Sequence, residues 1–183
     1  MNITRVGIDL AKNMFQLHGV DRFGNTVLKR KLNRKQMFVF FGTLPPTTIG
    51  LEACGTSHYW GRELAKLGHN VFVMPTQYVQ PYVKSNKNDA NDAEGICEAV
   101  SRPGMRFVAV KTEEQQILQM QHRIRSRLVR ARTALVNEIR GFLGEFGVVV
   151  PQGIWQLRRA LPILLEGNHS AVPVGFLPVL AEL

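Results

Sequence analysis

The first third of the chain consists of short apolar runs separated by turn residues, a pattern that predicts β-strands. Thr4–Leu10 is expected to form a buried strand. The runs Met14–Val20 and Thr26–Leu32 are expected to form a hairpin that turns at residues 21–25. Three strands therefore come first in the predicted order.

Helical and extended patterns alternate in the segment that follows. Cap and turn residues divide it into a helix, a strand, a helix, a strand and a helix: Asn33–Phe41, Thr47–Glu52, Ser57–Leu67 with Ser57 as N-cap, Asn70–Met74, and Asn88–Ser101 after an irregular stretch. The order βββαβαβα predicts an α/β fold in which helices flank a mixed sheet.

Residues 112–146 carry the strongest helical pattern. Thr112 and Gln115 are placed as a capping box at its start, and Gly147 follows its end. The apolar positions fall within a stripe of roughly 100° of the helix surface. They are Ile117, Met120, Ile124, Leu128, Ala131, Leu135, Ile139, Phe142 and Phe146.

A helix of this length spans about 50 Å at 1.5 Å per residue. Because this exceeds the size expected of the preceding domain, we expect the helix to project and to pair through its stripe with a second helix or chain. The expected seam of a dimer or higher homo-oligomer consists of Ile124, Leu128, Leu135 and Ile139. Docking of the stripe on its own domain is the alternative. Residues 148–183, with four prolines among apolar residues, are expected to form short helices without a complete core.

Composition adds a strong positive charge to this picture. The chain has 183 residues, of which 45% are hydrophobic, and 23 Lys and Arg against 14 Asp and Glu give a formal net charge of +9. Two clusters stand out: Lys29, Arg30, Lys31, Arg34 and Lys35, and Arg123, Arg125, Arg127, Arg130 and Arg132. Such clusters attract the phosphate backbone of nucleic acids without reading its sequence. A solvated basic face is the alternative for either cluster.

No stretch offers the ~18 consecutive apolar residues that a membrane span requires. The N-terminus lacks the pattern of a secretory signal, so a cytoplasmic location without membrane contact is expected. Cys54 and Cys97 are expected to be free thiols, because two cysteines fit a reducing compartment. Cys54 is expected to be buried rather than a nucleophile.

Four acids are the candidates for chemistry. Asp9 lies inside the first apolar strand and Glu52 ends a later one, whereas Asp89 and Asp92 share one face of a predicted first helical turn. Taken singly, Asp9 can be a strand-end acid that binds a turn amide, Asp89 a capping or helix-dipole acid, and Asp92 a solvated one. The order βββαβα is that of the RNase H-like fold, in which these four positions converge. Carboxylate-only ligation favours Mg²⁺ or Mn²⁺, and a pair of such ions can cleave phosphodiesters.

Three sequence runs resemble a known family. VGIDLAK at 6–12, LEACG at 51–55 followed by HYW at 58–60, and KNDANDA at 87–93 resemble the DEDD transposases of bacterial insertion sequences. These are relatives of the Piv site-specific invertases, and some members are guided by a bridge RNA. The resemblance covers about residues 4–150.

The resemblance implies a domain plan and a site. Residues 1–111 would be a RuvC-like domain, 112–150 a coiled-coil-type helix, and 151–183 the start of a C-terminal transposase domain that is missing here. Asp9, Glu52, Asp89 and Asp92 would be the catalytic and metal-binding tetrad. DNA and, in some members, a structured guide RNA would be the partners.

The family also implies a nucleophilic serine in its second domain. None of Ser57, Ser85, Ser101, Ser126 and Ser170 stands in that motif, so the resemblance assigns the nucleophile to none of them. We therefore expect little or no recombination from this chain alone.

Basic residues near the acids complete the expectations. Lys12 and Lys87 would contact a phosphate or offset carboxylate charge, and Lys84 and Lys87 are interleaved with Tyr78 and Tyr82, which could stack on unpaired bases. The predicted nucleic-acid contacts are Lys12, Lys29, Arg30, Lys31, Arg34, Lys35, Lys84, Lys87, Arg123, Arg127 and Arg130.

The predicted function is that of a DNA transposase or site-specific recombinase that cleaves and transfers strands with Mg²⁺ or Mn²⁺. The alternative is a catalytically inactive module for nucleic-acid binding and oligomerisation. A sugar or acetate kinase is the third possibility, because a strand ending Gly-Ile-Asp before a hairpin also opens the actin-like ATPase fold. It would need a second Gly-rich phosphate loop, which the sequence lacks.

Overall fold

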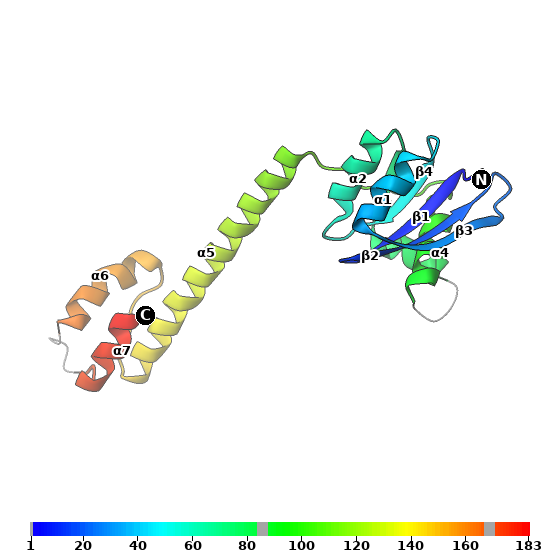
Figure 1. Cartoon of the computed structure of the whole chain (residues 1–183). Helices are drawn as coiled ribbons and strands as arrows, with labels where there is room; N and C mark the ends of the chain where they lie inside the picture. Colours follow the sequence, from blue (N-terminus) through cyan, green and yellow to red (C-terminus); the bar gives the residue numbers. More distant parts are fainter. Residues whose placement is uncertain (1, 84–87, 167–170) are drawn as a thin grey trace. The chain divides into compact units, whose positions relative to one another are not determined.

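The computed structural model describes residues 2–83, 88–166 and 171–183 of the chain. They form two compact units, Met1–Gln115 and Gln116–Leu183, each with its own elements (Figure 1). Within the described part of the chain, no helix combines the length and apolar character that a membrane span requires.

A five-stranded mixed sheet is the centre of the first unit. The strands are β1 (Arg5–Leu10), β2 (Met14–Val20), β3 (Thr26–Asn33), β4 (Thr48–Glu52) and β5 (Asn70–Met74). Their order across the sheet is β3-β2-β1-β4-β5. The first three strands are antiparallel neighbours, and β4 and β5 run parallel to β1. The predicted α/β class with an RNase H-like mixed sheet is confirmed.

The helices of this unit are α1 (Arg34–Gly42), α2 (Ser57–Lys66), α3 (Thr76–Val79), the 3-10 turn η1 (Gln80–Tyr82) and α4 (Asp89–Ala99). The predicted elements match the observed ones to within two residues. Two details of the prediction are wrong. The N-cap of α2 is Thr56 rather than Ser57, and the stretch after Pro75, expected to be irregular, contains α3 and η1.

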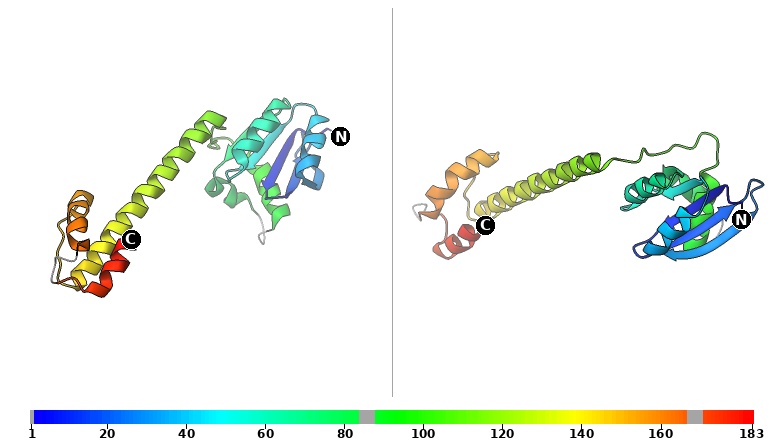
Figure 2. Two further views of the ribbon diagram at one scale, coloured as in Figure 1. Left: turned by 60° about the vertical axis from the view of Figure 1, so that its left-hand side comes forward. Right: turned by 45° about the horizontal axis from the view of Figure 1, so that its top comes forward.

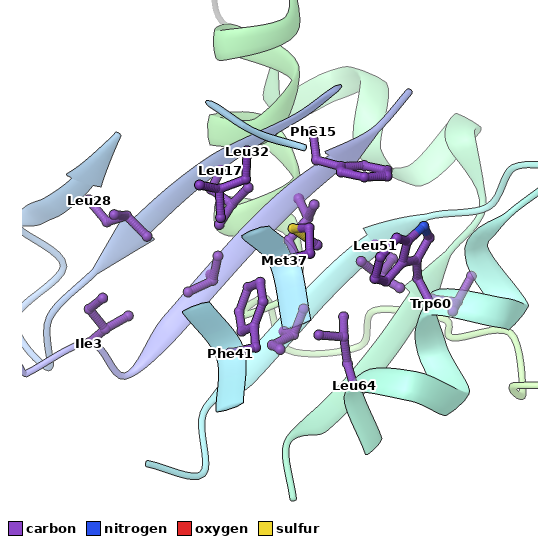
Figure 3. Close-up of a cluster of buried hydrophobic side chains, with 14 residues drawn as sticks. Ile3, Phe15, Leu17, Leu28, Leu32, Met37, Phe41, Leu51, Trp60 and Leu64 are labelled. Atoms are coloured by element: carbon purple, nitrogen blue, oxygen red, sulfur yellow. The ribbon is translucent and has the colours of Figure 1, made fainter. Parts of the chain in front are cut away.

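Side chains alternate between the two faces of each strand, and each face of the sheet packs against a different layer of helices. Ile8, Leu51 and their same-face neighbours bury against Met37 and Phe41 of α1 and Trp60 and Leu64 of α2 (Figure 3). The ring of Trp60 meets Phe15 of β2 edge-on, at a centroid distance of 4.9 Å. The opposite face of β4 and β5 packs on Ile96, Ala99 and Val100 of α4.

Two glycines let α4 lie directly on the sheet. A Cβ at Gly7 of β1 would lie 2.3 Å from the carbonyl oxygen of Ala93 and from the backbone nitrogen of Cys97. A Cβ at Gly50 of β4 would lie 3.0 Å from the side chain of Val100. The backbones of helix and strand therefore touch, which no larger residue at position 7 permits.

The second unit is built on the long helix α5 (Glu113–Glu145), which begins at the end of the first unit. Its predicted capping box is present: Gln115 N–H donates to Thr112 Oγ1 at 3.2 Å, and Thr112 N–H donates to Gln115 Oε1 at 3.0 Å. The remaining elements are α6 (Ile154–Leu165), the 3-10 turn η2 (Val174–Phe176) and α7 (Leu177–Glu182).

The C-terminal part of α5 is covered by the chain's own last helices, as both views in Figure 2 show. Ile139 and Leu143 are buried with Leu157 and Leu164 of α6 and Leu180 of α7, and Leu135 packs against this cluster. Residues 148–183 form short helices, as expected, and α5 supplies the side that completes their core. Leu135 and Ile139, placed in an intermolecular seam by the sequence, lie in an intramolecular core.

The earlier part of the apolar stripe is uncovered within the second unit. Ile117, Met120, Ile124 and Leu128 are each more than half exposed, and every residue from 120 to 134 is exposed. Only this part of the predicted stripe is left for a second helix.

Candidate active site

The first two candidate acids lie side by side at the carboxyl ends of β1 and β4. The parallel register pairs Gly7 with Gly50 and Ile8 with Leu51, so Asp9 and Glu52 follow at the next step. Gly7 and Gly50 both face α4. Because side chains two residues apart point to the same face of a strand, Asp9 and Glu52 also belong to the α4 face. Both are partly exposed.

The direction of α4 brings its first turn to the same end of the sheet. Ala93 and Cys97 both contact Gly7, but the thiol of Cys97 also lies 3.9 Å from the carbonyl oxygen of Arg5, two residues earlier in β1. The helix therefore runs antiparallel to β1, and one turn before Ala93 is Asp89. Asp92 shares the sheet-facing side of α4 with Ala93 and Ile96.

Ion pairs with β3 confirm this alignment row by row. Asp9, Gln16 and Lys31 are neighbours across β1, β2 and β3, and Lys31 Nζ lies 3.8 Å from Asp89 Oδ2. A second row, two residues earlier in β1, joins Gly7, His18 and Lys29 across the same three strands.

Glu94 of α4 pairs with His18 and Lys29 of this second row. Its Oε2 lies 3.8 Å from His18 Nδ1 and 3.9 Å from Lys29 Nζ. Asp89 and Glu94 of α4 thus pair with successive lysines on one face of β3. Sequence reasoning missed His18 and Glu94, because neither stands near a motif.

The four acids share one end of the fold without closing into a ligand cluster. Among the described residues, no group of three His, Cys, Asp or Glu side chains is close enough to hold a metal ion. Asp89 is instead paired with Lys31, and it is exposed.

The first basic cluster is divided between β3, an edge strand of the sheet, and the start of α1, which carries Arg34 and Lys35. Lys29 and Lys31 pair with acids of α4, and both remain more than half exposed. Arg30 points to the other face, with its guanidinium carbon 5.6 Å from the centroid of the Phe40 ring. Lys35 is exposed and lines a groove with Arg30 and Phe40. The cluster is therefore not a single patch.

Arg34 lies among aromatic rings beside the carboxyl end of β1. Its guanidinium carbon is 5.2 Å from the centroid of the Trp60 ring and 5.7 Å from that of Tyr59. Its Nη1 donates to the carbonyl oxygen of Lys12 at 3.4 Å. Arg34 thereby holds the exposed loop that follows β1.

The remaining predicted nucleic-acid contacts are in two places. Arg123, Arg127 and Arg130 are exposed on α5, where Arg130 Nε donates to the carbonyl oxygen of Ser126 at 3.3 Å. Lys84 and Lys87 lie outside the described residues.

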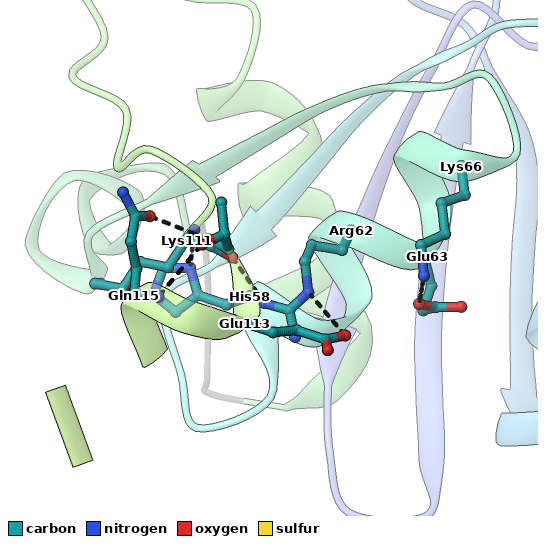
Figure 4. Close-up of polar contacts among 8 residues, drawn as sticks. His58, Arg62, Glu63, Lys66, Lys111, Glu113 and Gln115 are labelled. Atoms are coloured by element: carbon teal, nitrogen blue, oxygen red, sulfur yellow. Dashed lines mark hydrogen bonds and ion pairs between the residues drawn. The ribbon is translucent and has the colours of Figure 1, made fainter. Parts of the chain in front are cut away.

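A polar network that the sequence did not reveal joins α2 to Lys111 and Glu113 within the first unit (Figure 4). His58 Nδ1 accepts the backbone N–H of Lys111 at 3.3 Å, and Lys111 Nζ lies 3.0 Å from His58 Nε2. Arg62 donates to the carbonyl oxygen of Lys111 at 2.7 Å, and its Nε lies 4.0 Å from Oε1 of Glu113. Burial, together with the positive charges of Lys111 and Arg62, lowers the pKa of His58.

The two cysteines differ in their surroundings. Both are free thiols, as predicted. Cys97 is buried, and burial raises the pKa of its thiol. Cys54 is exposed, so the expectation of a buried thiol at this position is wrong. It follows the end of β4 in the turn before α2, where no element covers it.

The mixed sheet with its acids at one end has the topology of the RNase H-like class. Within that class, the chain belongs to the IS110-type family of DEDD transposases: the family model, described as "Transposase", matches residues 6–147. The resemblance of the three motifs is thereby confirmed.

Curated relatives agree with this assignment. A "Probable family 20 transposase" of Pseudomonas aeruginosa is 53% identical over 183 residues, which are 100% of this chain and 53% of that protein. The "Transposase for insertion sequence element IS1328" of Yersinia enterocolitica is 46% identical over 94% of this chain and 51% of its own length. That for element IS1111A of Coxiella burnetii is 44% identical over 91% of this chain and 46% of its own length. The chain thus spans about half the length of these relatives.

Proposed function

We propose that this chain forms the metal-binding and nucleic-acid-binding part of a DNA transposase that acts as a site-specific recombinase. The observation that carries the proposal is the packing of α4 on Gly7 and Gly50. This packing brings the first turn of α4 to the strand ends that carry Asp9 and Glu52. In the proposed reaction these residues support Mg²⁺-dependent cleavage and transfer of DNA strands.

The donor chemistry fits Mg²⁺ or Mn²⁺. Asp9, Glu52, Asp89 and Asp92 offer only carboxylate oxygens, which these hard cations prefer. When bound, the cations activate a nucleophile and stabilise a leaving oxygen. Asp9 and Glu52 would hold them from the rigid sheet, and Asp89 would exchange its ion pair with Lys31 for the metal. Lys31, once released, would be placed to bind a phosphate at the same end of the sheet.

The proposed partners are DNA, a second copy of the chain and, by the family resemblance, a structured guide RNA. The basic residues of β3 and α5 would bind the phosphate backbone. The second copy would cover the exposed part of the α5 stripe. Along the whole stripe the apolar positions recur every 11 residues, as at the exposed Ile117 and Leu128 and the buried Ile139. This repeat is typical of paired helices with a slight right-handed supercoil.

A second candidate function is an inactive module for nucleic-acid binding and assembly. The observation that favours it is that the acids, within the described ranges, do not form a group of three metal ligands. The affinity for a divalent cation distinguishes the two candidates.

Calorimetric titration of the 183-residue chain with Mn²⁺ separates them. We expect wild-type binding that the double variant Asp9→Asn with Asp89→Asn abolishes. Mg²⁺ should also raise the melting temperature of the wild type, because ligands that bind only the native state stabilise it.

The matched control is Glu63→Gln with Glu98→Gln, which removes two carboxylates of the same unit that, in the described part of the chain, pair with Lys66 and Arg102. This control should bind Mn²⁺ as the wild type does. Equal Mn²⁺ binding by the Asp9 and Asp89 variant, or no binding by the wild type, refutes the metal site and leaves the second candidate.

A further inference from the structure

An open pocket of about 300 Å³ lies in the second unit, between the C-terminal half of α5 and the turn that begins α6. Its lining contains two arginines, Arg132 and Arg140, and no acidic residue. Thr133, Asn137 and Gln152 add neutral hydrogen-bonding groups. A pocket with this lining is electrostatically suited to an anion.

Arg140 is held in a fixed orientation at this pocket. Its Nε donates to the carbonyl oxygen of Val150 at 3.0 Å. In the part of the chain that the structure describes, its two terminal nitrogens meet no acceptor and neither Arg132 nor Arg140 pairs with a carboxylate. A guanidinium fixed in this way presents two parallel N–H donors, the geometry that matches a phosphate.

The pocket also continues a basic flank of α5. Arg125 lies seven residues before Arg132 and therefore on the same side of the helix, and both are exposed. No acid occurs between residues 116 and 137. A single free anion would contact the pocket alone, whereas a linear polyanion can contact the arginines along α5 and the pocket at the same time.

We infer that this pocket binds a phosphate group of a nucleic-acid backbone, with Arg132 and Arg140 as its ligands. The inference rests on the nucleic-acid binding of the proposed function and adds a specific site to it. The backbone at Gly153, where α6 begins without a side-chain cap, lines the same pocket and adds positive potential to that of the two guanidinium groups.

The test measures binding of a short labelled DNA duplex by fluorescence anisotropy, at salt concentrations from about 50 to 200 mM. The pocket variant is Arg132→Gln with Arg140→Gln. The control, Arg158→Gln with Arg159→Gln, removes the same charge from exposed positions of α6. We expect the pocket variant to bind about tenfold more weakly than the control. The slope of log affinity against log salt should fall by about one.

A second arm uses inorganic phosphate as the probe. At matched ionic strength, phosphate should raise the melting temperature of the wild type and of the control but not that of the pocket variant. Far-UV circular dichroism checks that the variants fold. If the loss of the Arg140 bond to Val150 unfolds the unit, Arg132→Gln alone keeps the test valid, since Arg132 is exposed.

Each outcome decides the matter. Equal DNA binding by the pocket variant and the control overturns the inference. If phosphate nevertheless raises the melting temperature of the wild type and not that of the pocket variant, the pocket binds free phosphate instead. Absence of DNA binding by the wild type at low salt overturns both the inference and the nucleic-acid part of the proposed function. The Mn²⁺ titration is independent of either result.

Discussion

The contact of Gly7 with α4 allows a quantitative prediction for Gly7→Ala. The added Cβ would lie 2.3 Å from two backbone atoms of α4 and 2.8 Å from the Cα of Cys97. Ordinary contacts begin at 3.4 Å, so α4 must retreat by about 1 Å. The atoms that must move belong to helix backbone, which cannot rotate away as a side chain does. Overpacking of this kind typically costs ~1–3 kcal/mol, and backbone contacts place Gly7→Ala at the upper end of that range.

Urea denaturation followed by tryptophan fluorescence measures this cost. Trp60 is buried in the first unit, whereas Trp155 of the second unit is largely exposed, so the signal reports mainly the first unit. The control is Gly42→Ala at the end of α1, where an added Cβ meets nothing within 4 Å. The shift of α4 should also weaken Mn²⁺ binding. A Gly7→Ala protein as stable as the control, with unchanged Mn²⁺ affinity, would refute the account of how α4 is placed.

Two further predictions concern assembly and pH. Leu128→Asp should reduce association measured by light scattering, whereas Leu118→Asp, equally exposed but off the stripe, should not. Equal loss of association in both Asp variants contradicts a specific seam. Ile139→Ala should destabilise the second unit by ~2–5 kcal/mol without changing association. Because burial and two neighbouring cations lower the pKa of His58, the unfolded chain binds its proton first. Stability of the first unit should therefore decrease as the pH falls below the ordinary value of 6.5, and His58→Gln should reduce that decrease whereas His122→Gln, on exposed α5, should not.

Hydrophobic periodicity was sufficient to predict nearly every element of the first unit, because strands and helices bury one face at periods of two and 3.6 residues. It could not supply the register between strands. The proximity of Asp9 to Glu52 follows from the pairing of Gly7 with Gly50, and the place of Asp89 follows from the direction of α4. The site residues stay predictions until the metal titration is done.

Other features were missed for identifiable physical reasons. Charge counting along the sequence groups residues 29–35 into one basic cluster, although the period of two in a strand separates Arg30 from Lys29 and Lys31. The contact between His58 and Lys111 joins positions 53 residues apart, for which no local pattern exists. The prolines after residue 148 suggested an incomplete core, because sequence alone does not show that Ile139 and Leu143 complete it.

The exposed middle of α5 has a consequence for how the chain responds to its surroundings. Residues 120–134 are all exposed, so their helical state depends mainly on the capping box before them and the packed part of α5 after them. Arg123, Arg127 and Arg130 follow one another at helical spacing, and like charges so placed oppose the helix. A polyanion that neutralises them removes this repulsion. Helix order and anion binding are therefore thermodynamically linked in this segment: whatever strengthens one strengthens the other.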